Sequence, residues 1–233
     1  MKRSEFFDNL TSSRVHSRWV VRIFNAVLLA SVFAFAGCLS RPPLHRQTFA
    51  FSIPGSPATN GAAGGPVLGI RILQIAPPFD GRSFVYRTGE FSYARDPYAE
   101  FLSSPAEGLV APVCAILRGD GCFSAVVEAG SAFKPDTLVE IRLNQLFGDI
   151  RKPGSPCAVL AMQVTFLGAT NGLPGSVILQ RNYSRRIPMN SATAAALMEG
   201  WNRALAGIFA EVASDFRRRE GEGGTMDTVK AAK

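Results

Sequence analysis

The chain has 233 residues, of which 47% are hydrophobic and 18% are charged, the composition of a globular protein that can bury one sizeable core. Its net charge of +7 does not indicate nucleic-acid binding. Residues 1–37 contain five basic and two acidic residues, so they supply three of the seven positive charges, and the rest of the chain has no basic stripe. Histidine occurs only at His16 and His45, so the later domain lacks the usual base or ligand of triads and metal sites, and we expect no cofactor and no metal.

Residues 1–37 are organised as an export signal. A long basic segment precedes the apolar run 23–37, which is shorter than the ~20 residues of a comfortable membrane span. The run ends in Phe35-Ala36-Gly37-Cys38, which is similar to the bacterial lipobox, with Phe35 where Leu is usual. We therefore predict a lipoprotein signal peptide, lipidation of Cys38 and stable membrane attachment through its acyl chains. The alternative is an ordinary buried cysteine at the end of a signal anchor.

The residue after the cysteine bears on localisation. Leu39 stands where an Asp is the familiar inner-membrane retention signal of enteric bacteria. We therefore expect a protein anchored on the periplasmic side of the outer membrane.

The segment 38–66 is predicted to be a lipidated N-terminus with a short strand over 47–53 and a flexible Gly- and Pro-rich loop over 54–66. A buried strand is expected over 67–75, because aliphatic residues are dense there. Two short strands, 83–87 and 91–94, flank the turn Thr88-Gly89.

Two helix starts follow in the sequence. Asp96-Pro97 pairs an N-cap residue with a proline at the first helical position, which predicts a first helix. Ser104-Pro105-Ala106-Glu107 is a capping box, which predicts a second helix to about Arg118, with Gly119 after it. Its apolar positions share one face at helical spacing, although Pro112 lies among them.

Further strands are predicted over 122–128, 138–147, 158–167 and 177–187. In 138–147 apolar and polar residues alternate, so one face of that strand should be buried. The last element is a helix over 191–218 with one apolar stripe, formed by Leu197, Trp201, Leu205, Ile208, Phe209, Val212 and Phe216. We expect the stripe to pack on the sheet; a membrane or partner surface is the alternative.

These elements predict a single α/β domain over 67–218 and a disordered, charged tail over 219–233. The fold expected is a two-layer sandwich in which a mixed or antiparallel sheet carries its helices on one face.

One segment of this domain resembles a known family. Val85-Tyr86-Arg87, Tyr93, Asp96 and Tyr98, followed by Pro105 and Leu109 and set between a lipobox and a terminal amphipathic helix, resemble the ABC-type transport auxiliary lipoproteins, the family of paraquat-inducible protein C. Phe101 stands where that family usually has Trp. The resemblance implies a non-catalytic subunit that docks on a mammalian-cell-entry (MCE) domain protein, served by an ABC permease and ATPase, in a system that moves phospholipid or related lipids across the envelope.

Two sets of side chains are candidate sites. The dense aromatic residues and one guanidinium form a candidate partner surface, which includes Tyr86, Arg87, Tyr93, Tyr98 and Phe101. The equal alternative is that they pack under the first helix. Cys114, Cys122 and Cys157 would share an oxidising compartment, and Cys114 with Cys122 is the candidate disulfide pair because a short turn joins them.

Two other functions stay open at this point. An envelope hydrolase would need a nucleophile and base from Asp, Glu, Lys or Tyr, and no Gly-x-Ser-x-Gly motif or carboxylate pair supports one. A lipoprotein regulator of cell-wall synthesis or pilus assembly could share the anchor and the fold. Neighbouring genes for a permease, an ATPase and an MCE protein would favour the transport function over both.

Overall fold

The computed structural model describes residues 45–52, 64–128 and 131–231, so Cys38 and the predicted signal peptide lie outside the described residues. The chain divides into two compact units, Met1–His45 and Arg46–Lys233, and every described element belongs to the second. In chain order the elements are β1 (Gln47–Phe49), β2 (Val67–Ile75), β3 (Ser83–Arg87), β4 (Tyr93–Phe101), α2 (Pro105–Gly119), β5 (Ala125–Val127), β6 (Thr137–Asp149), β7 (Cys157–Thr170), β8 (Leu173–Pro188) and α3 (Ala194–Ala231).

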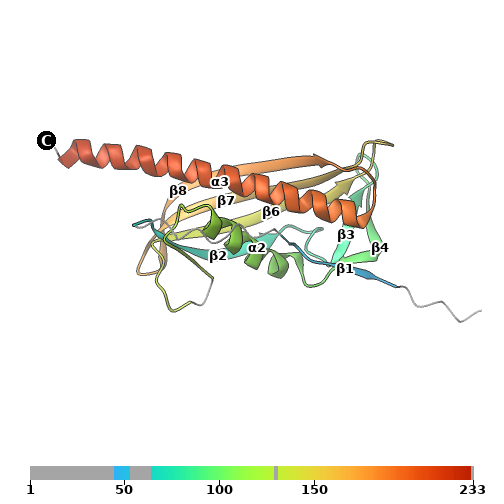
Figure 1. The fold of residues 1–233 in the computed structure, drawn as a ribbon, viewed down its shortest axis with the longest axis horizontal. Helices are drawn as coiled ribbons and strands as arrows, with labels where there is room; N and C mark the ends of the chain where they lie inside the picture. Colours follow the sequence, from blue (N-terminus) through green and yellow to red (C-terminus); the bar gives the residue numbers. More distant parts are fainter. Residues whose placement is uncertain (1–44, 53–63, 129–130, 232–233) are drawn as a thin grey trace, which may run out of the picture. The chain divides into compact units, whose positions relative to one another are not determined.

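The described strands form one mixed sheet organised around β6. Along one edge β6 pairs antiparallel with β7, which pairs antiparallel with β8. Along its other edge β6 pairs parallel first with β2 and then, at its C-terminal end, with β3. β5 continues the sheet beside β2, while β4 and then β1 continue it beside β3. Both helices pack on the same face and contact each other (Figure 1), which confirms the predicted two-layer arrangement.

The predicted alternation in β6 is confirmed over its first half. Val139, Ile141 and Leu143 are buried, whereas Arg142 and Asn144 are exposed. A bulge between residues 143 and 145 then shifts the pairing with β7, and the last four residues of the strand are all buried. β6 therefore ends inside the protein, and its C-terminal end is the place where β3 joins the sheet.

The prediction of a helix that begins at Asp96-Pro97 is wrong, because both residues lie within β4. The Asp96 carboxylate accepts hydrogen bonds from the backbone N–H groups of Tyr98 and Ala99, at 2.8 and 3.1 Å. An N-cap side chain makes this same local bond, but here the bond satisfies backbone N–H groups of an irregular strand that pairs with β3 and β1. Local capping chemistry alone could not distinguish the two outcomes.

The capping box of α2 is confirmed. Ser104 Oγ accepts from the N–H of Glu107 at 3.4 Å, and a Glu107 carboxylate oxygen accepts from the N–H of Ser104 at 3.2 Å. The helix ends at Gly119, as predicted, with Asp120 as its C-cap. The strand predicted over 122–128 is shorter than expected, since only Ala125–Val127 pairs with β2.

The apolar stripe of α3 is buried against the sheet, which confirms core packing over an external surface. At its centre Trp201 Nε1 donates to the carbonyl of Val159 in β7 at 3.2 Å, and the indole packs against Phe84 and Phe101, with ring centroids 5.0 and 5.5 Å away. The helix also continues to Ala231, so the predicted end at Arg218 is wrong and the helix enters the segment expected to be disordered. No proline interrupts residues 194–231, so the helix meets no strong local stop.

A separate finding concerns the membrane. Within the described ranges, neither α2 nor α3 combines the length and the apolar character that a membrane-spanning helix needs.

We expect Trp201→Ala to lower the free energy of unfolding by about 3 to 5 kcal/mol, because it removes a fully buried ring and leaves the Val159 carbonyl without its donor. Urea unfolding followed by circular dichroism measures this change. Trp201→Phe, which keeps a ring in place, should cost less. A loss below about 1 kcal/mol for the alanine variant would show that the indole contributes little to the core.

Candidate functional site

Two of the five predicted partner-binding residues belong to the core. Tyr86 is 9% exposed and Phe101 is 3% exposed. The Phe101 ring centroid lies 4.6 Å from that of Phe84, and Tyr86 packs beside Gly148 at the end of β6. Their predicted place on an exposed surface is therefore wrong. Alternation along β3 turns Phe84 and Tyr86 toward the helices, and the aromatic composition of the segment does not reveal this.

The other three predicted residues are at least partly exposed. Arg87 follows Tyr86 and so faces away from the helices, where its guanidinium carbon lies 5.8 Å from the Tyr93 ring centroid. The guanidinium also donates to the carbonyls of Gly89 and Glu90, at 3.3 and 2.6 Å, which holds it in place. Tyr93 is 44% exposed and Tyr98 is 59% exposed. The structure thus brings Arg87 and Tyr93 together on one face of the sheet.

The sequence did not indicate a buried carboxylate beside this pair. Asp149 ends β6, is 5% exposed and is the register partner of Arg87. It accepts from Nε and Nη2 of Arg151, at 2.9 and 2.7 Å, and from Nη2 of Arg186 in β8 at 2.7 Å. The three arginines, Asp149 and Tyr93 together are called the arginine–tyrosine site below.

The charge of this site is fixed by its hydrogen bonds. The pKa of Asp149 lies well below its ordinary value, chiefly because Arg151 donates hydrogen bonds to the carboxylate; Arg186 adds to the effect and burial opposes it. The same bonds raise the pKa of both arginines. Two guanidinium groups therefore hold one charged carboxylate, and with Arg87 on the neighbouring strand the site keeps a surplus of positive charge next to a half-exposed phenol ring. Such a surface suits a partner that offers carboxylates, carbonyls and rings.

The candidate disulfide is not formed. Cys114 is buried and its thiol lies 3.7 Å from a carboxylate oxygen of Glu128, whereas the Cys122 thiol donates to Asp120 at 2.8 Å. The turn after α2 directs the two thiols to different neighbours, so closeness in sequence was a poor guide to their geometry.

Comparison with solved structures shows the fold. A Xanthomonas campestris protein assigned to the family model DUF330 matches 77% of this chain and 99% of its own length, at 15% identity and a TM-score of 0.63. An uncharacterized protein matches 74% of this chain and 99% of its own length, at 13% identity and a TM-score of 0.58. Lipoprotein GNA1162 from Neisseria meningitidis matches 62% of this chain and 97% of its own length, at 13% identity and a TM-score of only 0.34. No family model and no curated protein matches the sequence.

We expect Asp149→Asn to lower the free energy of unfolding at neutral pH by about 2 kcal/mol, less than the ~3 to 5 kcal/mol of a fully buried pair, because both arginines reach solvent. Since folding lowers the pKa of Asp149, its charge contributes fully above the ordinary pKa of about 4, and the contribution is lost as the pH falls below that value.

Urea unfolding of the wild type and of Asp149→Asn between pH 7 and pH 3 measures this dependence. The stability difference should shrink as the pH falls. Asp80→Asn, which changes an exposed carboxylate, is the matched control and should behave as wild type at neutral pH. A difference for Asp149→Asn that stays constant over this range would contradict the assignment.

Proposed function

We propose that the chain is a lipid-anchored, non-catalytic auxiliary subunit of an MCE-type ABC lipid transport system, held on the periplasmic side of the outer membrane by acylated Cys38. In this proposal the arginine–tyrosine site docks on the MCE protein. One observation above all supports it: Arg87 and Tyr93 belong to the segment that resembles the auxiliary lipoproteins, and they stack on the face of the sheet opposite α2 and α3.

The electrostatics of the described residues favour a docking role over catalysis. Asp149 is a poor general base, because two arginines hold its carboxylate in the charged form. Burial, with the neighbouring Glu128 and Asp120 carboxylates, raises the pKa of Cys114 and Cys122 to about 11 each, so both remain thiols at neutral pH. Burial, together with Asp96, raises the pKa of Tyr86 to about 12. None of these groups is prepared for proton transfer or nucleophilic attack at neutral pH.

We expect the double variant Arg87→Ala with Tyr93→Ala, which truncates two members of the arginine–tyrosine site, to lose co-purification with the cognate MCE protein. Arginine and tyrosine hot spots commonly cost at least ~2 kcal/mol on truncation, roughly a thirtyfold weakening of binding. Both side chains reach solvent, so the circular dichroism spectrum should stay native. The measurement is a pull-down from cells that carry the full chain and the MCE protein.

The matched control for the pull-down is Leu173→Ala. Leu173 is 69% exposed and starts β8, whereas the arginine–tyrosine site lies where β8 ends. The control should co-purify as wild type does. Unchanged pull-down of the double variant with a native spectrum would place the interface elsewhere, and loss of the native spectrum would show that these side chains support the fold.

Cys38→Ser tests the anchor. The substitution removes the thiol that accepts the acyl chains, so we expect a precursor that is uncleaved or released from the membrane and carries no label after growth with labelled palmitate. Membrane fractionation and the label are read together. Label incorporation that persists in the variant would rule out Cys38 as the lipidated residue.

A further inference from the structure

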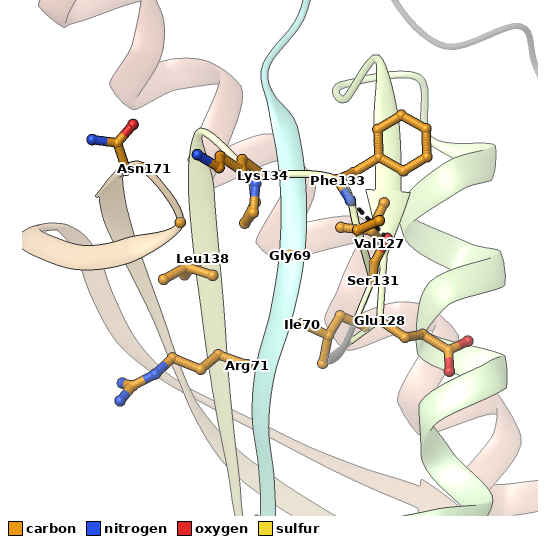
Figure 2. A pocket seen from close by; sticks show the side chains of 13 residues that line it. Gly69, Ile70, Arg71, Val127, Glu128, Ser131, Phe133, Lys134, Leu138 and Asn171 are labelled. Atoms are coloured by element: carbon orange, nitrogen blue, oxygen red, sulfur yellow. Dashed lines mark hydrogen bonds between the residues drawn. The ribbon is translucent and has the colours of Figure 1, made fainter.

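A pocket of about 460 Å³ lies near the N-terminal ends of β2 and β6, whereas the arginine–tyrosine site lies where β6 ends. Residues of β2, the segment 131–135 and the β7–β8 turn line it (Figure 2). Its volume is within the range of ordinary small-molecule sites.

A close backbone approach forms this pocket. A side chain on Gly69 would place its Cβ 2.9 Å from Pro135, which is closer than real contacts allow. The same proline lies 3.7 Å from the Cβ position of Gly172 in the β7–β8 turn. Pro135 can therefore pack this closely on β2 only because residue 69 is glycine, whereas at position 172 a Cβ would make an ordinary contact with the proline.

The cationic groups of the pocket are arranged on one side. Arg71 is the extra residue of a bulge in β2, since the pairing with β6 moves from Ile70 to Ile72 across it. Figure 2 shows Arg71, Lys134 and Asn171 on the same side of β2. Arg71 forms an ion pair with Glu140, whereas Lys134 pairs with no acidic group in the described part of the chain.

The one carboxylate in the lining is directed elsewhere. Glu128 points away from Arg71 and Lys134 in Figure 2, and it lies at hydrogen-bonding distance from the Cys114 thiol. Among the described residues the pocket therefore keeps an uncompensated positive charge at Lys134, with the Asn171 amide on the same side. Figure 2 shows the Arg71 guanidinium farther along β2, with Leu138 between it and these two groups, so a multi-oxygen anion would accept from Lys134 and Asn171.

The remaining lining is apolar. Leu138 and Ile70 are each 5% exposed, and Val127 is half-buried. Phe133 is 72% exposed, so a large ring stands in solvent beside Lys134. A ligand that covered this ring would remove apolar surface from water while its charged group contacted Lys134.

We propose that this pocket binds a small amphiphile with a phosphate headgroup, in which Lys134 and Asn171 contact the phosphate and Phe133, Leu138 and Val127 contact the apolar body. The same headgroup chemistry is carried by a lipid and by free phosphate. The site is distinct from the docking surface proposed above, and its occupancy does not require a transport partner.

The test is isothermal titration calorimetry on the full chain, held in micelles of a maltoside detergent, which carries no phosphate group. The probes are hexyl phosphate, inorganic phosphate and hexylammonium. Hexyl phosphate should bind saturably at one site per chain. Lys134→Gln should weaken it about tenfold, the effect of losing one charge-assisted hydrogen bond. Lys152→Gln, which removes an exposed lysine outside the pocket, is the matched control.

The outcomes separate the ligand sources. Tighter binding of hexyl phosphate than of inorganic phosphate, reversed by Phe133→Ala, supports an amphiphile. Equal binding of the two, lost in Lys134→Gln, keeps the phosphate site and assigns it to free phosphate. The proposal is overturned by the absence of saturable phosphate binding, by equal binding of hexylammonium, or by variants that match Lys152→Gln. Lys134 is exposed, so Lys134→Gln should leave the fold intact and its effect on binding can be read directly.

Discussion

Trp201 reaches from α3 to the carbonyl of Val159 in β7, and its ring lies against Phe84 in β3 and Phe101 in β4. β7 lies on one side of β6, and β3 and β4 lie on the other. One side chain thus holds both halves of the sheet under the same helix. An indole N–H buried without an acceptor would be costly, so the single hydrogen bond fixes how α3 lies on the strands. The location of both candidate sites follows from this packing, because it determines which face of the sheet is covered.

Two buried carboxylates each bind an arginine of the edge strand β8. Asp215 in α3 accepts from Arg181 Nη1 at 2.5 Å and from the Tyr183 hydroxyl at 2.9 Å, both in the edge strand β8. Burial alone would raise the pKa of Asp215, but these bonds outweigh it and the pKa is lowered. On the other face of the sheet, Asp149 accepts a hydrogen bond from Arg186 of the same strand. The charged side chains that tie β8 to its own domain also make its edge a poor template for strand addition.

The two candidate sites lie toward opposite ends of β6 and use different chemistry. The arginine–tyrosine site is a positively charged surface whose arginines are held in place by backbone carbonyls and by Asp149. The pocket beside Gly69 is concave, carries an unpaired ammonium and is bordered by an exposed ring. A rigid exposed patch suits a protein partner, and a concave site of mixed polarity suits a small ligand. Because most of the length of β6 separates them, a change at one site leaves the other accessible to measurement.

The sequence by itself determined the elements whose signals are local and periodic. Strands β2 and β3, the capping box of α2, the alternation in the first half of β6 and the stripe of α3 all follow from side-chain spacing, because each period matches one backbone geometry. The two-layer arrangement followed from their order.

Only the tertiary structure decided where the chain departs from such signals. Asp96-Pro97 makes a capping bond inside a strand, since pairing with two neighbouring strands outweighs the local preference for a helix. Tyr86 and Arg87 are adjacent in sequence but lie on opposite faces, so one side chain is a buried ring and its neighbour is a partly exposed cation. Asp149 meets Arg186 across β7, and Gly69 meets Pro135 across a loop. These contacts join residues far apart in the chain, and the forces that set them are burial and pairing across strands, which no short window of sequence contains.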